Sequence, residues 1–159
     1  MPPFLTVAET TLLNAKLKAA PIAAAHPDAL VLAADTLVAF EGTIFGKPRD
    51  LDEAFAMLSR LNGRSHEVFS GVWLAHRATG RRHGFIVGSR VRFRRLSARK
   101  IREYMSRINP LDKAGAYAAQ HNEMNLIASI QGSSTNVIGL PMERLGEELR
   151  HFDATLART

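Results

Sequence analysis

Cysteine is absent from this chain of 159 residues, and aromatic residues make up only 7% of it. Without cysteine there can be no disulfide, no thiolate catalysis and no cysteine-based zinc site. No apolar run approaches the roughly 20 residues of a membrane-spanning helix. The opening residues, MPPFLTVAET, lack the basic start and apolar core of a signal peptide. These absences are compatible with a reducing cytoplasm, where we expect the protein, and we expect no membrane partner.

Several common catalytic and nucleotide-binding motifs are also missing. There is no Walker loop and no G-x-G-x-x-G fingerprint. None of the 6 histidines pairs at H-E-x-x-H spacing, which argues against a histidine zinc site. Ser70-Gly71 lacks the flanking glycine of a nucleophile elbow. Any chemistry must therefore come from a different arrangement of residues.

The composition indicates a globular domain with a positive charge balance. Hydrophobic residues are 46% and charged residues 23%, and the length fits one domain. The net charge of +6 favours polyanionic partners. Arg90, Arg92 and Arg94 would share one face of a strand, where they could bind nucleic acid or coat a solvated edge strand. We favour the edge strand, because aromatic residues for base stacking are sparse nearby.

Within the stretch over residues 30–48, LVLAADTLVAFEGTIFGKP, the apolar run over 30–40 predicts a strand covered on both faces. Asp35 interrupts it, and an ionised carboxylate there is costly unless it is paired, hydrogen-bonded or bound to a cation. Glu41-Gly42 predicts a turn, and Lys47 follows on a loop. An acid and a lysine near one strand end suit a metal and a phosphate. Alternatively, Asp35 is partly exposed or caps a neighbouring loop.

Helix and strand signals place these residues in an α/β domain. Thr6 and Glu9 have capping-box spacing and begin a helix that Pro21 should bend or end. Asp50 and Ser97 are candidate caps of two further helices, the second reaching Met105. The other expected elements are strands over 66–76 and 83–93 in a hairpin around Thr79-Gly80, a strand over 125–130, a polar loop over 132–136 and a helix over 142–152.

Six motifs occur in one order along the chain: AADT, GKP, LNGRSHEVFSGV, VRFRRLS, PLDKAGAY and NVIGLP. In this order they closely resemble the Maf family of nucleoside triphosphate pyrophosphatases. The resemblance covers nearly the whole chain, which we treat as one Maf-like domain over 1–159. It implies a single elongated α/β domain, with a central mixed sheet flanked by helices and a cleft between two lobes. It also implies hydrolysis of a nucleoside triphosphate to the monophosphate and pyrophosphate, a divalent cation (Mg²⁺ or Mn²⁺) and a homodimer.

The resemblance assigns roles to individual residues. Asp35 matches the catalytic aspartate, the proton acceptor for the attacking water and a candidate metal ligand. Thr36 matches a position linked to substrate choice, Lys18 and Lys47 match phosphate-binding lysines, and Gln120 matches a glutamine linked to base or phosphate recognition. Such roles suit triphosphate hydrolysis, which depends on positioning and charge stabilisation. The alternatives are a solvated helix lysine at 18, a turn lysine at 47 and a loop-stabilising glutamine at 120.

AADT, with Gln120 after GAY, resembles the branch of the family that prefers dTTP and UTP. A branch that takes 7-methyl-GTP is the alternative. The chain departs from the family at its start, where it is truncated and lacks an S-x-S-P-R-R loop that binds phosphate.

This departure has three explanations: a coding start further upstream, which we favour, a degenerate member that binds nucleotides without cleaving them, or a missing piece supplied by another protein. We expect unpaired strand edges and bare apolar surface. We also expect weak or no activity from the short chain, and dTTP and UTP hydrolysis from an upstream-extended form.

Overall fold

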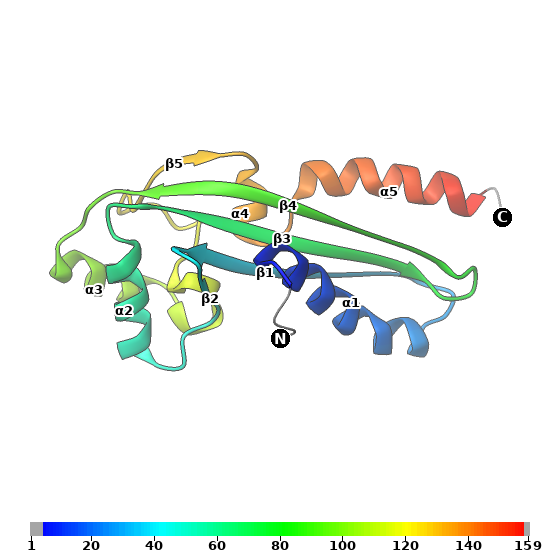
Figure 1. The fold of residues 1–159 in the computed structure, drawn as a ribbon, viewed down its shortest axis with the longest axis horizontal. Coiled ribbons are helices and arrows are strands. Elements are labelled where there is room, and N and C mark those ends of the chain that lie inside the picture. Colours follow the sequence, from blue (N-terminus) through cyan, green and yellow to red (C-terminus); the bar gives the residue numbers. More distant parts are fainter. Residues whose placement is uncertain (1–4, 158–159) are drawn as a thin grey trace.

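Five strands form one sheet in the computed structural model, which describes residues 5–157, with side chains up to residue 153. Their order is β2-β1-β3-β4-β5. The strands are β1 (Leu30–Phe40), β2 (Thr43–Phe45), β3 (Ser65–His76), β4 (Arg81–Phe93) and β5 (Ile127–Gln131). The α/β class is confirmed, and Figure 1 shows the expected elongated shape, with the β3–β4 hairpin running along most of its length.

The sheet differs from the expected mixed sheet, because each of its strand pairs is antiparallel. The connections explain this. Glu41 and Gly42 have φ angles of 48° and 74°, so they form the tight two-residue turn that joins β1 to β2. Gly80 (φ 70°) turns β3 into β4 around the predicted hairpin. A parallel pair would need a crossover instead.

Helix α1 (Val7–Ala25) lies on one face of the sheet and begins with the predicted Thr6–Glu9 capping box. The helix does not end at Pro21 but continues to Ala25. Proline removes one hydrogen bond within the helix, but this residue faces solvent, where water can satisfy the freed carbonyl. The opposite side of the helix buries Ala15, Ala19 and Ala23, at 0%, 1% and 6% exposure. These small side chains let α1 approach the strands closely.

Gly71 on β3 allows the closest approach of α1 to the sheet. A Cβ atom at this position would lie 2.4 Å from the backbone nitrogen of Leu12 and 2.4 Å from the carbonyl carbon of Thr11. Real Cβ atoms essentially never come so close to backbone, so only glycine fits here. Gly71 pairs with Asp35 in the register of β1 and β3. The point where α1 approaches the sheet most closely is therefore directly beside Asp35.

The prediction that β1 is covered on both faces is wrong for its first half. Val31 is buried beneath α1, but Leu30 and Leu32, on the other face, are 36% and 39% exposed. Within the described residues, β2 pairs only with Val38, Ala39 and Phe40, and no strand pairs with the outer edge of residues 30–37. The expected unpaired edge and exposed apolar surface are therefore present.

The remaining helices cover the opposite face and one end of the sheet. Helix α5 (Met142–Ala157) packs on the hairpin through Leu145 and Phe152. Helices α2 (Leu51–Leu61) and α3 (Ala98–Arg107) begin at the predicted caps Asp50 and Ser97. They pack against a larger core with Phe93 and Tyr117.

The loop predicted over 132–136 contains the start of a helix. The segment is not a loop throughout, because the Ser133 hydroxyl caps a short helix, α4 (Ser134–Ile138).

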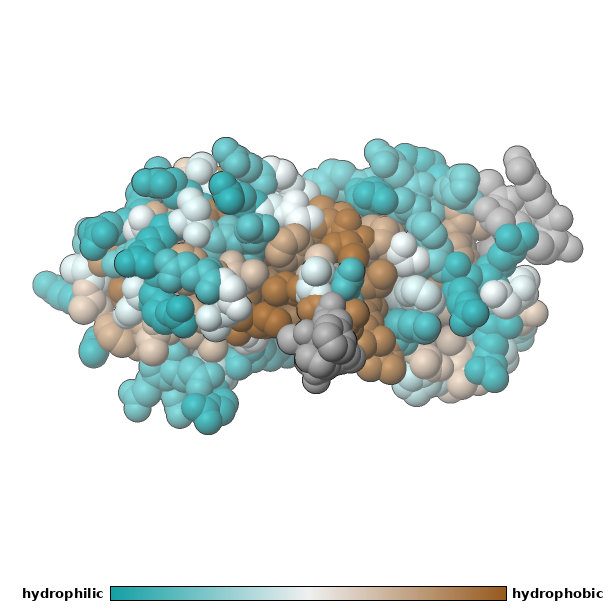
Figure 2. Space-filling view, viewed as in Figure 1, coloured by the Kyte–Doolittle hydropathy of each residue, from teal (hydrophilic) through white to brown (hydrophobic). Residues whose placement is uncertain are grey.

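On the face shown in Figure 2, apolar residues gather near the middle and polar residues cover both ends. No helix within residues 5–157 is long and apolar enough to cross a membrane.

Candidate active site

A pocket of about 440 Å³ lies beside β1 where pairing with β2 stops. Its volume falls in the range of small-molecule sites. All of the predicted site residues line it: Lys18, Asp35, Thr36, Lys47 and Gln120. They come from α1, β1, the loop after β2 and the loop before β5, so residues far apart in sequence meet at one place.

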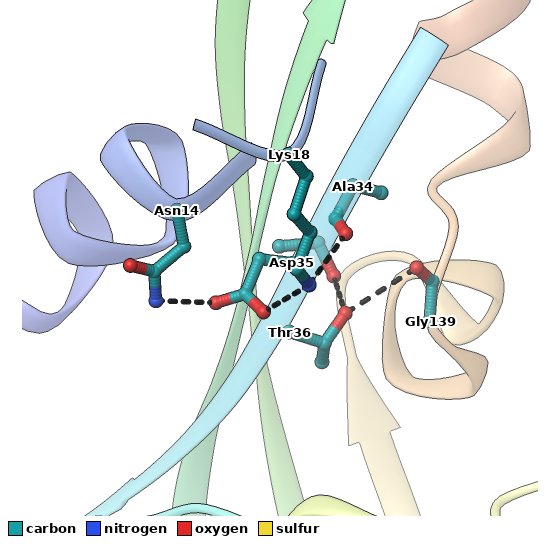
Figure 3. A network of polar contacts seen from close by, with 7 residues as sticks. Asn14, Lys18, Ala34, Asp35, Thr36 and Gly139 are labelled. Carbon is teal, nitrogen blue, oxygen red and sulfur yellow. Dashed lines mark hydrogen bonds and ion pairs between the residues drawn. The ribbon is translucent and has the colours of Figure 1, made fainter. Parts of the chain in front are cut away.

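Asp35 is held by two side chains of α1. Lys18 Nζ lies 2.7 Å from Asp35 Oδ1, and Asn14 Nδ2 donates to Asp35 Oδ2 at 2.9 Å. Figure 3 shows both donors reaching the carboxylate from the same helix. Asn14 and Lys18 are one helical turn apart and therefore share a face. The Asp35 side chain is 15% exposed, and this pairing supplies the compensation that an acid within an apolar strand requires.

Thr36 faces the other side of the sheet, as alternation along a strand requires. Its hydroxyl lies 2.7 Å from Ser70 Oγ and donates to the Gly139 carbonyl at 3.3 Å (Figure 3). Ser70 in turn donates to the Asn136 carbonyl at 3.3 Å. Thr36 therefore connects β1 to the α4 segment, which forms one wall of the pocket.

The outer edge of β1 also brings backbone groups to the pocket. Phe40 and Thr43 flank the two-residue turn, so the backbone of Phe40 points toward β2. Alternation then points the N–H groups of Ala34 and Thr36 outward, and Lys18 Nζ donates to the Ala34 carbonyl at 3.3 Å. Within residues 5–157 the structure records no other residue as a partner of these two N–H groups, and N–H groups beside an acid and lysines can bind anionic oxygens.

Positive charge on the opposite wall comes from two lysines. Lys47 is exposed and makes no hydrogen bond or ion pair with any other described residue. Its loop is fixed by the Gly115 N–H, which donates to the Gly46 carbonyl at 3.1 Å. Lys113 also lines the pocket and pairs with Asp112 at 3.2 Å. Gln120 is exposed beside them.

Tyr117, which lines this wall, forms a buried aromatic pair with His66. Tyr117 Oη and His66 Nε2 are joined by a hydrogen bond of 2.8 Å, and the two rings meet edge to face. Burial raises the pKa of Tyr117 above its ordinary value and lowers the pKa of His66 to about 4. Both groups are therefore uncharged at neutral pH, and the pair positions the wall rather than titrating.

A divalent cation such as Mg²⁺ would need oxygen ligands in this pocket. Among residues 5–157, no group of three or more His, Cys, Asp or Glu side chains gathers where it could hold a metal. The pocket nevertheless contains the carboxylates of Asp35 and Asp112. Mg²⁺ is commonly bound by one or two carboxylates together with phosphate oxygens and water. Each oxygen of Asp35 also keeps a second lone pair beside its bond to α1.

Sequence reasoning missed several residues of this site. Asn14 was not considered, although its four-residue spacing from Lys18 on one helix was a usable signal. Ile138 was also missed, because a single aliphatic residue within NVIGLP carries no chemical signature. The motif PLDKAGAY predicts structural support for the cleft wall from Asp112, Lys113, Gly115 and Tyr117, and all of these except Gly115 line the pocket.

An acid bound by a lysine, two further lysines and outward-facing backbone N–H groups surround one pocket, and this arrangement suits a small polyanion. Comparison with known proteins identifies the class. The family model described as "Maf-like protein" matches residues 4–152. The chain belongs to this family.

Relatives with assigned names are similar along most of the chain. A protein of Myxococcus xanthus named dTTP/UTP pyrophosphatase is 49% identical over 80% of this chain, and the match spans 64% of that protein. Proteins of the same name from Carboxydothermus hydrogenoformans and Salinibacter ruber are 42% and 43% identical, over 91% and 97% of this chain and 77% and 76% of their own length. The chain thus spans about two thirds to three quarters of these relatives.

Proposed function

We propose that this protein is a nucleoside triphosphate pyrophosphatase that cleaves the bond between the α- and β-phosphates of dTTP and UTP. The observation that carries the proposal is the meeting of Asp35, Lys18 and Lys47 in one pocket. The relatives named dTTP/UTP pyrophosphatase support the choice of substrate.

In this mechanism Asp35 accepts a proton from the water that attacks the α-phosphate. Asn14 and Lys18 hold the two carboxylate oxygens, so the acid is oriented before substrate binds. Preorganised groups of this kind require no rearrangement during the reaction. Lys18 lies beside the acid and can turn toward the phosphate that is attacked.

The other groups bind the charge of the triphosphate. Lys47, which has no partner among the described residues, and Lys113 act as point cations on the β- and γ-phosphates. The N–H group of Thr36 donates to a phosphate oxygen, and Gln120 contacts the base or a phosphate. Asp35 would hold Mg²⁺ or Mn²⁺ together with the phosphates, and such an ion lowers the pKa of bound water and polarises a phosphoryl oxygen.

The homodimer and the cytoplasmic location stay predictions. Sedimentation of the purified protein, with and without dTTP, tests the dimer. Fluorescence microscopy of a tagged form tests the location.

The experiment for the proposed function measures pyrophosphate release from dTTP, UTP, ATP, GTP and 7-methyl-GTP in the presence of Mg²⁺ or Mn²⁺. We expect the protein to release pyrophosphate from dTTP and UTP faster than from the purine triphosphates. A preference for 7-methyl-GTP would place the protein in the other branch of the family. Tight binding of these nucleotides without pyrophosphate release would make it a nucleotide-binding protein.

A further inference from the structure

Ile138 is an apolar side chain exposed at the wall of a charged pocket. It ends α4 and is 52% exposed. Among the large hydrophobic residues that are exposed within residues 5–153, Ile138 alone lines this pocket. Exposed apolar residues are common on protein surfaces and need no explanation singly. Ile138 differs from the other exposed apolar residues because charged side chains line the same pocket.

The position of Ile138 is fixed by buried polar contacts. A helix of only 5 residues has little stability of its own. Asn136, which is 0% exposed, donates from Nδ2 to the Val68 carbonyl at 3.1 Å and to Ser89 Oγ at 2.9 Å. Ser89 donates to the Ser133 carbonyl at 2.8 Å. These contacts anchor the short helix to β3 and β4, so Ile138 cannot fold back into the core.

A further hydrogen bond connects the Ile138 segment to the strand of the acid. Gly139, the next residue, accepts a hydrogen bond from Thr36, the neighbour of Asp35 (Figure 3). The apolar surface is therefore held beside the strand that carries the reacting group. Lys47 and Lys113 come from a separate wall, formed by the loop before α2 and the segment after α3.

This division of the pocket matches the two chemical parts of a nucleotide. A triphosphate needs cations and N–H donors, whereas a nucleobase presents flat faces of low polarity. We propose that Ile138 is the surface on which the nucleobase lies, and that it is a specificity-determining residue. This inference rests on the proposed function. It assigns base binding to α4 and leaves the phosphates to the lysines.

The test separates base binding from phosphate binding by calorimetry with Mg²⁺ present. One ligand is a dTTP analogue with NH in place of the oxygen between the α- and β-phosphates, and the other is inorganic tripolyphosphate. We expect Ile138→Ala to weaken binding of the analogue about tenfold, near the lower end for lost apolar contacts in a binding pocket. Binding of tripolyphosphate should not change. Ile138→Val should keep most of the affinity.

The chain offers a matched control. Ile22 on α1 is also 52% exposed but does not line the pocket. Ile22→Ala should leave both dissociation constants unchanged. If Ile138→Ala weakens both ligands equally, or neither, the inference is wrong.

The wild-type result separates this inference from the proposed function. Equal affinity for the analogue and for tripolyphosphate would overturn the inference, while pyrophosphate release could still support the enzyme. If the wild-type protein binds neither ligand, the proposed function fails and the inference fails with it.

Discussion

The two ends of the sheet are packed in different ways. At the α2–α3 end, one continuous core on a single face contains large side chains such as Phe45, Phe93 and Tyr104. At the α1–α5 end, two small clusters lie on opposite faces, one around Ala19 and Val31 and the other around Leu74 and Phe85. The pocket takes Asp35 and Lys18 from the second end and Lys47, Lys113 and Gln120 from the first.

This contrast suggests a division of labour. The α2–α3 end has the larger buried core and presents Lys47 and Lys113, which we propose to bind phosphate. The α1–α5 end holds Asp35, the proposed proton acceptor, by a close contact between a helix and two strands. Changes at the first end should therefore act on stability or on substrate affinity, and changes at the second should act on turnover.

The largest effect should come from Asp35→Asn in an active form of the protein. Loss of a general base lowers turnover by about 10²- to 10⁴-fold, and the nearly isosteric change should leave the fold intact. Asp112→Asn is the matched control, because it removes a carboxylate from the same pocket. It should alter KM more than kcat. Retained turnover in Asp35→Asn, with the same metal dependence, would remove Asp35 from the mechanism.

Leu58→Ala should give the largest loss of stability. Leu58 is 2% exposed in the continuous core, and its truncation should lower the free energy of unfolding by about 3 kcal/mol. Leu145→Ala, in the smaller cluster under α5, should have less effect because the helix can settle onto the sheet. Urea unfolding measures both. Equal losses would show that the two ends do not differ in packing energy.

His66 should make stability depend on pH. Burial lowers its pKa from 6.5 to about 4, so between these values the unfolded state binds the proton first. The free energy of unfolding should therefore fall as pH is lowered from 6.5 to 4, by up to about 3 kcal/mol from this group. His66→Gln keeps an acceptor for Tyr117 and should remove that part of the slope. An unchanged slope in chemical denaturation would contradict the assignment.

The smallest effect should come from Lys47→Ala. Loss of one exposed cation should raise KM about 3- to 10-fold for all triphosphates alike, because the lysine binds phosphate. Added salt should reduce the difference from wild type. Lys100→Ala, which removes an exposed lysine away from the pocket, is the control. A loss confined to one base would show that Lys47 reads the base.

Strong local signals allowed much of this fold to be predicted. The strand over Leu30–Phe40 has the predicted bounds, because an apolar run ends there at a left-handed two-residue turn. The hairpin of β3 and β4 was found because Thr79-Gly80 separates two long strand patterns. The roles of the acid, the lysines and the glutamine of the pocket were predicted from the resemblance to the Maf family, and their convergence could not be derived from spacing alone.

The errors have tertiary causes. Pro21 does not end α1, since the buried alanines on the other side of the helix hold it against the sheet. The α4 helix looks like a polar loop, because its stability comes from Asn136 and Ser89 in contact with distant strands. Asn14 takes its role from Asp35, which lies 21 residues further along the chain.

Gly71 gives the pocket a dependence on a residue that no substrate could touch. Its missing side chain sets how near α1 comes to β3, and therefore the separation between Asn14, Lys18 and the carboxylate. A methyl group there would push α1 away from β3, and Asn14 and Lys18 would move away from Asp35 together with the helix. Inactivating substitutions in this protein should thus include positions between α1 and the sheet that do not line the pocket.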